Sequence, residues 1–491
     1  MSIDIEKAKS RVIGRFELYK RRALDAFERD KFDIAEYYAF KASRLMYNYN
    51  ILYRDDDLES LLHGLADGVG VCSFVPDSNR VVIIDTFGES LRVLAWQYAK
   101  GIVDSGKQMM FLVPSSKADA ASFSLLKQYL SSNGCLVKPF ANNLNHARES
   151  VLEINELIKA YQPGDIFFHG GPCDVLVLTS LYSVEGPRKH LINLTDHAFW
   201  LGSTGFDNYL EFREYGRGIS TSYRGIAADK ETYCPYYPIQ TVVSNDYLGL
   251  PFSDDEPFFI AGGSGYKIGG SDRFREIAAR ILAENEQLNF LWLSASVPDP
   301  IAWLQRSFPG RVHVQHERAD LFEVCKRAKF MLQTYPIYGA LMTQIAVAAG
   351  IVPITLQFEG VEPAANLLTN NEIEIDYPDV DAAVNEANKL LSDEGYRMAR
   401  RAEMLGAIIT PKQFSLRLEE IMNGARGGFS LARAETPNDS EFKEKYLIRK
   451  PGKFDLERLD FSKYDLRHIT ILRPQAILAA AYALLNKIKK H

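Results

Sequence analysis

Cysteine, long apolar runs and an excess of positive charge are all scarce in this sequence. Its 491 residues include five cysteines, and no two of them have a CxxC spacing, so neither a disulfide framework nor a tetrahedral zinc site is predicted. No run of about 18 apolar residues occurs, and the charged N-terminus lacks the apolar core of a secretory signal. We therefore expect a cytoplasmic protein with reduced cysteines and no membrane-spanning helix.

The charge balance excludes another class of protein. The chain has 57 Lys+Arg against 63 Asp+Glu, a net charge of −6, which argues against a nucleic-acid partner. The charge is uneven, because residues 441–491 contain 12 basic and 6 acidic side chains. Residues 473–491 are predicted to form a helix with an apolar face and a lysine-rich end. Two roles stay open for it: peripheral contact with the inner face of a membrane, or packing against the domains.

Alternating short strands and helices dominate the middle of the chain. Strands are predicted at Val81–Ile84, Met109–Val113 and His190–Leu194, with helices between them, and the alternation restarts at Phe258. This pattern is typical of parallel, doubly wound sheets, so we predict an α/β fold with two Rossmann-like domains facing across a cleft. The predicted units are an N-terminal helical arm (1–70), an acceptor domain (71–250), a donor domain (251–430) and a basic tail with a terminal helix (431–491).

The N-terminal arm is predicted to contain two helices within residues 5–49. Phe16, Tyr19, Ala23 and Phe27 recur at helical spacing, and small Ala alternates with bulky aromatic residues as in a single helix-turn-helix repeat. We find no second copy at a fixed period, which excludes a solenoid. The arm is expected to act as a helical cap or as a homo-oligomer contact, with docking of a protein partner as the alternative.

A glycine-rich segment follows the first strand of the second domain. It runs from Ala261 to Gly270, and its glycines allow backbone N–H groups to approach an anionic ligand at the start of a helix. Lys267 adds a point charge suited to a diphosphate. The segment matches neither the P-loop nor the GxGxxG pattern, and a tight strand–helix turn is the structural alternative. The predicted donor-binding residues here are Gly263, Ser264, Gly265 and Lys267.

A second segment between a strand and a helix begins at Tyr335. Its backbone amides are suited to a second phosphate, and hydrogen-bonding side chains lie at the start of the following helix. Close helix–strand packing is the alternative explanation for Ala348–Pro353. The predicted donor-binding residues are Tyr335, Pro336, Gly339, Thr343 and Gln344.

A third segment closes the first domain. Asp196 and His197 follow a predicted strand, and a histidine beside a carboxylate suits a general base or an oriented donor. A structural histidine is the alternative. Downstream, Arg213, Arg217 and Arg224 are candidates for clamping phosphate or carboxylate, although each arginine could equally form a surface ion pair.

Together these segments resemble GT-B glycosyltransferases, in which the first domain takes the acceptor and the second takes a nucleotide-sugar donor. The residues Trp200-Leu201-Gly202, Thr204-Gly205 and Tyr266-Lys267-Ile268 are also similar to motifs of the O-GlcNAc transferase family and its bacterial protein-glucosylating relatives. The resemblance implies that Lys267 contacts the donor diphosphate. The predicted acceptor- or phosphate-binding residues are Thr204, Arg213 and Arg224. The sequence departs from the family in having Gln344 near the position of a ribose-gripping Glu.

The resulting hypothesis is transfer of a sugar from a nucleotide diphosphate sugar, expected to be UDP-linked, to a hydroxyl acceptor. His197, assisted by Asp196, is the predicted base. Asp55–Asp57 and Asp254-Asp255 are predicted as solvated turn or cap residues, so no metal or other cofactor is expected. The resemblance favours a bacterial surface glycan such as lipopolysaccharide as acceptor, with a protein as the alternative. A non-catalytic GT-B scaffold and a nucleotide-sugar 2-epimerase are the rival functions.

Overall fold

The computed structural model describes residues 5–87, 94–237, 247–269, 271–316, 318–357, 364–369, 372–431 and 433–438. The predicted helix at 473–491 lies outside these ranges. Within them, no helix is both long and apolar enough to cross a bilayer.

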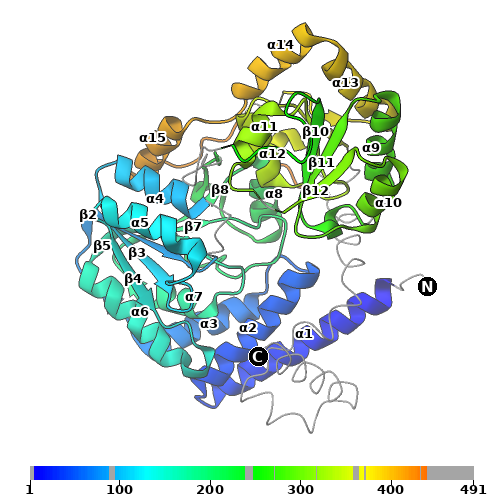
Figure 1. Cartoon of the computed structure of the whole chain (residues 1–491). Helices are drawn as coiled ribbons and strands as arrows, with labels where there is room; N and C mark the ends of the chain where they lie inside the picture. The colour runs from blue at the N-terminus through cyan, green and yellow to red at the C-terminus, as the bar shows by residue number, and fades with distance from the viewer. Residues whose placement is uncertain are drawn as a thin grey trace.

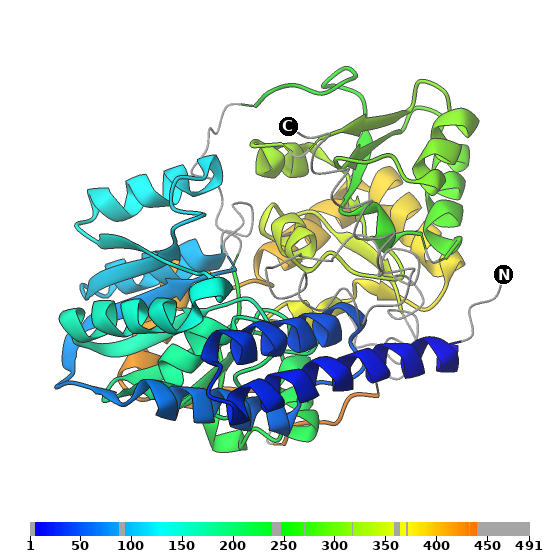
Figure 2. The same cartoon turned by 90° about the horizontal axis from the view of Figure 1, so that it is seen from below.

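Three helices form the N-terminal arm: α1 (Ile5–Glu28), α2 (Phe32–Tyr49) and α3 (Asp56–Val69). α1 and α2 lie side by side along one side of the molecule (Figure 2). Phe16 and Ala23 are fully buried, as their helical spacing predicts, whereas Phe27 is partly exposed and packs over Gly64 of α3. The Asp55 carboxylate accepts a hydrogen bond from the Leu58 N–H, which confirms this aspartate as a helix cap.

A seven-stranded parallel sheet forms the first half of the molecule, in the order β4-β3-β2-β5-β7-β8-β9. Its strands are β2 (Asp77–Asp85), β3 (Gln108–Pro114), β4 (Leu136–Phe140), β5 (Pro163–His169), β7 (Arg188–Ile192), β8 (Asn208–Glu211) and β9 (Glu231–Tyr233). The intervening helices are α4 (Leu94–Asp104), α5 (Ser124–Ser132), α6 (Ala147–Tyr161), α7 (Val175–Ser183) and α8 (Glu214–Tyr223), and a small parallel pair joins β1 (Cys72–Ser73) to β6 (Val184–Glu185).

The sheet is covered on both faces because successive residues of its strands point to opposite sides. In β2, Val81 and Ile83 pack in the cluster that contains α4 and α5, whereas Val82 and Ile84 pack with α6, α7 and the arm. β7 begins two residues before the predicted strand, because Arg188 continues the ladder opposite Asp165 of β5.

A six-stranded sheet forms the second half, in the order β12-β11-β10-β13-β14-β15. Its strands are β10 (Phe258–Gly262), β11 (Asn289–Leu293), β12 (Val312–Gln315), β13 (Met331–Leu332), β14 (Pro353–Leu356) and β15 (Asp376–Tyr377). Its helices are α9 (Arg273–Glu284), α10 (Asp299–Ser307), α11 (Leu321–Arg327), α12 (Ala340–Ala348), α13 (Val380–Ser392) and α14 (Glu394–Leu405).

Both sheets share one topology. Counted along the chain, the strands of each sheet follow the order 3-2-1-4-5-6, and the first sheet adds a seventh strand at its edge. In such sheets ligands bind at the carboxyl ends of the strands where the order reverses. The reversal lies between β2 and β5 in the first sheet and between β10 and β13 in the second. The predicted α/β class with two Rossmann-like sheets is confirmed.

The last described helix, α15 (Pro411–Met422), returns to the first sheet. It packs against α4 (Figure 1), and the Arg417 guanidinium donates to the Tyr233 carbonyl oxygen at 2.9 Å. Beyond the helix, Gly427 exchanges backbone hydrogen bonds with the β9 strand. The predicted donor-domain segment therefore ends on the surface of the first sheet, and the chain connects the two halves twice.

Candidate active site

The glycine-rich segment lies where the second sheet reverses its strand order. Gly262 ends β10, and a Cβ there would lie 2.9 Å from the Leu293 carbonyl oxygen, so the close strand approach requires glycine. Gly263 has a φ of 137°, which again favours glycine. Ser264 is exposed, and Gly265 begins a single turn of 3₁₀ helix that ends at Lys267.

Lys267 connects this segment to the loop after β13. Its Nζ donates to the Tyr338 carbonyl oxygen at 3.2 Å and lies 3.7 Å from the position that a Cβ on Gly339 would take. Two of the predicted donor-binding segments are therefore neighbours at one edge of the sheet, with a lysine charge between them.

The loop after β13 is braced by a residue that sequence analysis missed. The Gln333 side-chain oxygen accepts hydrogen bonds from the backbone N–H groups of Thr334 at 3.0 Å and Gly339 at 3.1 Å. Its amide nitrogen donates to the Thr343 hydroxyl, which in turn donates to the Gly339 carbonyl oxygen at 3.2 Å. Tyr335 and Pro336 are buried within the braced loop.

Thr343 and Gln344 point into the fold. Both are at most 2% exposed, and the Gln344 amide donates to the Leu367 carbonyl oxygen at 3.3 Å. The hydrogen bonds observed for these two side chains thus support the loop and helix α12. A direct contact of either residue with a donor stays a prediction.

Asp196 and His197 lie in the loop after β7. Arg213 binds the Asp196 carboxylate with two nitrogens, at 2.5 and 2.9 Å, and His197 Nδ1 lies 3.3 Å from the same carboxylate. Although burial opposes ionisation, the Arg213 guanidinium and the His197 contact hold the pKa of Asp196 well below its usual range. The Asp196 side chain is 1% exposed, whereas that of His197 is 37% exposed and can meet a ligand.

The other two arginines of this region are buried. Arg224 donates to the carbonyl oxygens of Asp196 at 2.8 Å and Ala198 at 2.6 Å, and its guanidinium lies over the Trp200 ring at 4.3 Å. Arg217 donates to the Leu431 carbonyl oxygen at 2.7 Å. Arg224 is fully buried, so its observed contacts hold the loop that contains Asp196, and a phosphate contact remains a prediction.

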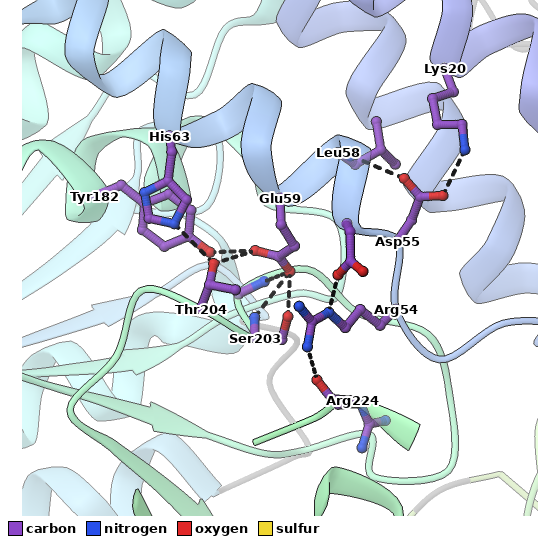
Figure 3. Close-up of polar contacts among 12 residues, drawn as sticks. Lys20, Arg54, Asp55, Leu58, Glu59, His63, Tyr182, Ser203, Thr204 and Arg224 are labelled. Carbon is purple, nitrogen blue, oxygen red and sulfur yellow. Dashed lines mark hydrogen bonds and ion pairs between the residues drawn. The ribbon is translucent and has the colours of Figure 1, made fainter. Parts of the chain in front are cut away.

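Thr204 lies farther along the same loop and is exposed. Its hydroxyl donates to Glu59 at 3.1 Å and lies 2.9 Å from His63 Nε2. Both partners belong to α3 of the arm (Figure 3). No local sequence signal indicated these contacts, because Glu59 and Thr204 are 145 residues apart.

Tyr338 lies in the loop after β13, and its hydroxyl donates to the Leu356 carbonyl oxygen at 3.2 Å. Burial, foremost, and the charge of Asp376 raise the pKa of this phenol, and the Arg213 guanidinium of the first sheet opposes the rise. Arg213 is therefore within electrostatic reach of Tyr338, and the Tyr338 carbonyl oxygen holds Lys267. Lys267 is the cation in direct contact with this loop, whereas Arg213 is paired with the Asp196 carboxylate that His197 also approaches.

Comparisons with known proteins show the fold. No family model and no curated protein matches the chain. A glycosyltransferase structure from Rickettsia africae is similar at a TM-score of 0.51 and 10% identity, covering 70% of this chain and 97% of that one. The Anabaena protein Alr3699/HepE in complex with UDP is similar at a TM-score of 0.51 and 12% identity, covering 70% of this chain and all of the other.

This chain has the GT-B fold. The predicted resemblance is thereby confirmed at the level of fold. A Thermobaculum terrenum O-GlcNAc transferase is also similar, at a TM-score of 0.49 and 12% identity, covering 88% of this chain and 84% of that one. At identities of 10–12% these similarities concern the fold alone.

The first sheet of this GT-B chain has a polar pair that sequence analysis did not single out. Asp85 ends β2 and His169 ends β5, and His169 Nδ1 lies 2.9 Å from the Asp85 carboxylate where the strand order reverses. Both side chains are buried, and His169 Nε2 has no hydrogen-bond partner among the described residues. Their positions at predicted strand ends were the signal that could have identified them.

A pocket adjoins this pair at the carboxyl edge of β5 and β7. It is lined by Gly170 and Gly171 on one side and by Asn193, Thr195 and Trp200 on the other. Asn193 Oδ1 and Trp200 Nε1 are buried and have no partner within the described part of the chain. Both residues line the pocket beside the loop that contains Asp196. In the ranges described, no three His, Cys, Asp or Glu side chains form a group able to hold a metal ion.

Proposed function

We propose that this chain is a glycosyltransferase that moves a sugar from a nucleotide diphosphate sugar, UDP-linked, to a hydroxyl acceptor. The observation that carries the proposal is the contact of Lys267, from the glycine-rich segment, with the loop after β13 at the carboxyl edge of the second sheet, where the strand order reverses. A lysine charge beside a glycine-rich loop at such an edge suits an anionic diphosphate, and the fold neighbour from Anabaena is described in complex with UDP.

The contact between the Asp196 carboxylate and His197 Nδ1 supports His197 as the base. Asp196 is held ionised by Arg213, so its carboxylate can only accept a hydrogen bond. A carboxylate at Nδ1 favours the tautomer of the neutral ring that bears its proton there, so Nε2 is the nitrogen we assign to take the acceptor proton. As the acceptor oxygen bonds to the anomeric carbon, its proton passes to Nε2. The bond from that carbon to the diphosphate oxygen breaks, and Lys267 stabilises the charge left on the diphosphate.

The acceptor we propose is a bacterial surface glycan such as lipopolysaccharide. The resemblance noted in the sequence supports this choice, and a protein acceptor is the alternative that an acceptor panel would reveal. Contact of residues 473–491 with the membrane belongs to the same proposal and lies outside the described residues.

Donor binding followed by turnover tests the function. UDP and UDP-sugars should raise the melting temperature of the full chain, and a sugar should appear on an added acceptor. Lys267→Ala should lower turnover by about 10²–10³-fold while the protein stays folded, because a preorganised charge at the leaving group is lost. Lys326→Ala is the matched control, since Lys326 is an exposed lysine of α11 paired with Glu323.

Three results would contradict the proposal. Wild-type turnover in Lys267→Ala would remove the donor assignment. Donor consumption that is unchanged by any acceptor would favour the 2-epimerase, and absence of binding to every nucleotide diphosphate would favour a non-catalytic scaffold.

A further inference from the structure

One buried carboxylate of the arm holds the far end of the His197 loop. Glu59 of α3 is 2% exposed, and its Oε1 accepts hydrogen bonds from the N–H groups of Gly202 at 2.8 Å and Ser203 at 3.0 Å and from the Ser203 hydroxyl at 3.0 Å. Its Oε2 accepts from the hydroxyls of Tyr182 at 2.7 Å and Thr204 at 3.1 Å. Figure 3 shows these donors converging on Glu59 from the loop and from α7.

A second arm residue holds the loop at His197 itself. The Asn50 side-chain amide donates to the His197 carbonyl oxygen at 2.5 Å. Asn50 ends α2 in the left-handed conformation, with φ 50°, and its own N–H returns to the Met46 carbonyl oxygen. This backbone conformation suits asparagine, and the residue is fully buried, so its amide has little freedom to turn away.

The start of the loop is also tied to the arm, through Arg224. The Arg54 guanidinium, between α2 and α3, donates to the Arg224 carbonyl oxygen, as Figure 3 also shows. Arg224 in turn donates to the carbonyl oxygens of Asp196 and Ala198. The arm thus contacts the loop directly at His197 and at 202–204, and indirectly at 196–198.

These contacts determine where the loop can lie. A buried carboxylate that accepts five hydrogen bonds cannot shift without leaving several donors unsatisfied, which is costly in a dry environment. Gly202 has a φ of 118°, and a Cβ there would lie 2.9 Å from Leu191 Cδ1, so the loop backbone is also tightly packed. His197, the one side chain of the Asp196–His197 pair with substantial exposure, is itself one of the two points that the arm holds directly.

We propose that Glu59 and Asn50 are positioning residues for His197, so that the helical arm is a functional part of the active site. The inference rests on the proposed function, in which His197 takes the acceptor proton. It assigns the arm a role beyond capping or docking: the arm sets the distance between His197 and the sugar bound at the second sheet. A displacement of about 1 Å at such a base lowers turnover by about 100-fold.

The test compares variants of the full chain. Glu59→Ala and Asn50→Asp should each lower kcat, Glu59→Ala by about 100-fold, while the Kd for UDP changes less than about twofold because the donor lies on the other sheet. Glu59→Gln should recover most of the kcat, since an amide oxygen can still accept from Gly202 and Ser203. Glu36→Ala is the matched control. Glu36 is a fully buried carboxylate of α2 that bonds Thr179 of α7 instead of the loop.

A purely structural role predicts a different pattern. Glu36→Ala should lower the melting temperature and leave the kcat of the folded fraction unchanged. If Glu59 had only a structural role, Glu59→Ala would behave in the same way. The positioning role is overturned if Glu59→Ala retains wild-type kcat, or if its kcat falls only in proportion to the unfolded fraction. The pH profile adds a readout: the acid limb of kcat should shift in Glu59→Ala and stay in place in Glu36→Ala.

A measurement without turnover separates this inference from the proposed function. In protein with ¹³C-labelled histidine, the ring signal of His197, assigned by its loss in His197→Ala, should move in Glu59→Ala and Asn50→Asp and stay in Glu36→Ala. If wild-type protein transfers no sugar but the signal moves as expected, the proposed function fails and the loop positioning stands. If the wild type is active and the signal and kcat are both unchanged, the positioning fails alone.

Discussion

Residues 333–344 of the second sheet are braced from within, by the side chain of Gln333, whereas residues 196–204 of the first sheet are held by helices α2 and α3. The loop at residues 333–344 keeps its shape wherever its own strand, β13, and helix, α12, are formed. The loop at residues 196–204 depends on packing between segments more than 140 residues apart. The two loops can therefore be disturbed separately, one at a time.

The buried carboxyls described in the two halves of the molecule differ as well. Burial raises the pKa of four carboxyls in the half that contains the arm and first sheet: to about 8 for Glu36 and Glu231, and to about 7 for Asp174 and Glu211. In the other half, burial raises the pKa of Asp376 against two backbone hydrogen bonds that oppose the shift. Among the described residues, the half with the arm and the first sheet thus contains more buried groups whose ionisation opposes folding.

The largest expected effect comes from removing the buried guanidinium of Arg224, which holds the loop at residues 196–204. Arg224→Leu should lower the free energy of unfolding by about 4 kcal/mol, because it leaves the Asp196 and Ala198 carbonyl oxygens and the nearby Glu211 carboxyl without their cation. Urea unfolding of the full chain measures it. Arg273→Leu, at an exposed arginine of α9, should stay within about 0.5 kcal/mol of wild type. Equal stability of the two variants would disprove the bracing by Arg224.

The pH dependence of the free energy of unfolding is the next test. It should originate in the half that contains the arm and the first sheet. Burial raises the pKa of Glu36 to about 8, so between its unfolded pKa near 4.5 and about 8 the folded state binds one more proton than the unfolded state. Stability therefore falls as pH rises through this window and is constant above it. Glu36→Gln removes the titrating group and should flatten the decline by a few kcal/mol.

Melting temperatures between pH 5 and 9 check this expectation. Asp119→Asn, at a carboxylate whose side chain is 92% exposed, should leave the wild-type slope in place. An unchanged slope in Glu36→Gln would mean that this carboxyl titrates in the folded state as it does in the unfolded chain.

The smallest expected effect concerns the loop at residues 333–344 and leaves the loop at residues 196–204 in place. Gln333→Ala leaves the N–H groups of Thr334 and Gly339 without their acceptor, so the Kd for UDP should rise about tenfold, or about 1.4 kcal/mol, with the His197 ring signal unchanged. Gln333→Glu keeps an acceptor oxygen and should bind nearly as the wild type does. Calorimetry with UDP measures both variants, and wild-type affinity in Gln333→Ala would show that the brace does not contribute to donor binding.

Much of the fold could be predicted because its signals are local. Short β-branched runs such as Val81–Ile84, each followed by a helical stretch, indicate parallel strands whose carboxyl ends share an edge. The glycine-rich segment and the loops at Tyr335 and Asp196 were found for that reason. Helices α3 and α7 were missed, although they bury the arm against the first sheet.

Within the candidate site, the orientation of side chains could not be predicted. Helix α12 has apolar residues on nearly every side, so its sequence contains no amphipathic phase to tell that Thr343 and Gln344 face inward. Glu59 and Asn50 look like ordinary polar residues of a helix and a helix end. Their partners lie 143 and 147 residues away, beyond the reach of any local pattern.

The sequence by itself determined the two parallel sheets, the loops at their carboxyl edges and the placement of Lys267 and His197 on those loops. These features follow from periodicity and from the residues that end each strand. The tertiary structure decided that Arg213 pairs with Asp196, that Gln333 braces one loop, and that the arm holds the other. Each of those contacts joins groups that only the packed fold brings within hydrogen-bonding distance, where burial makes an unsatisfied partner costly.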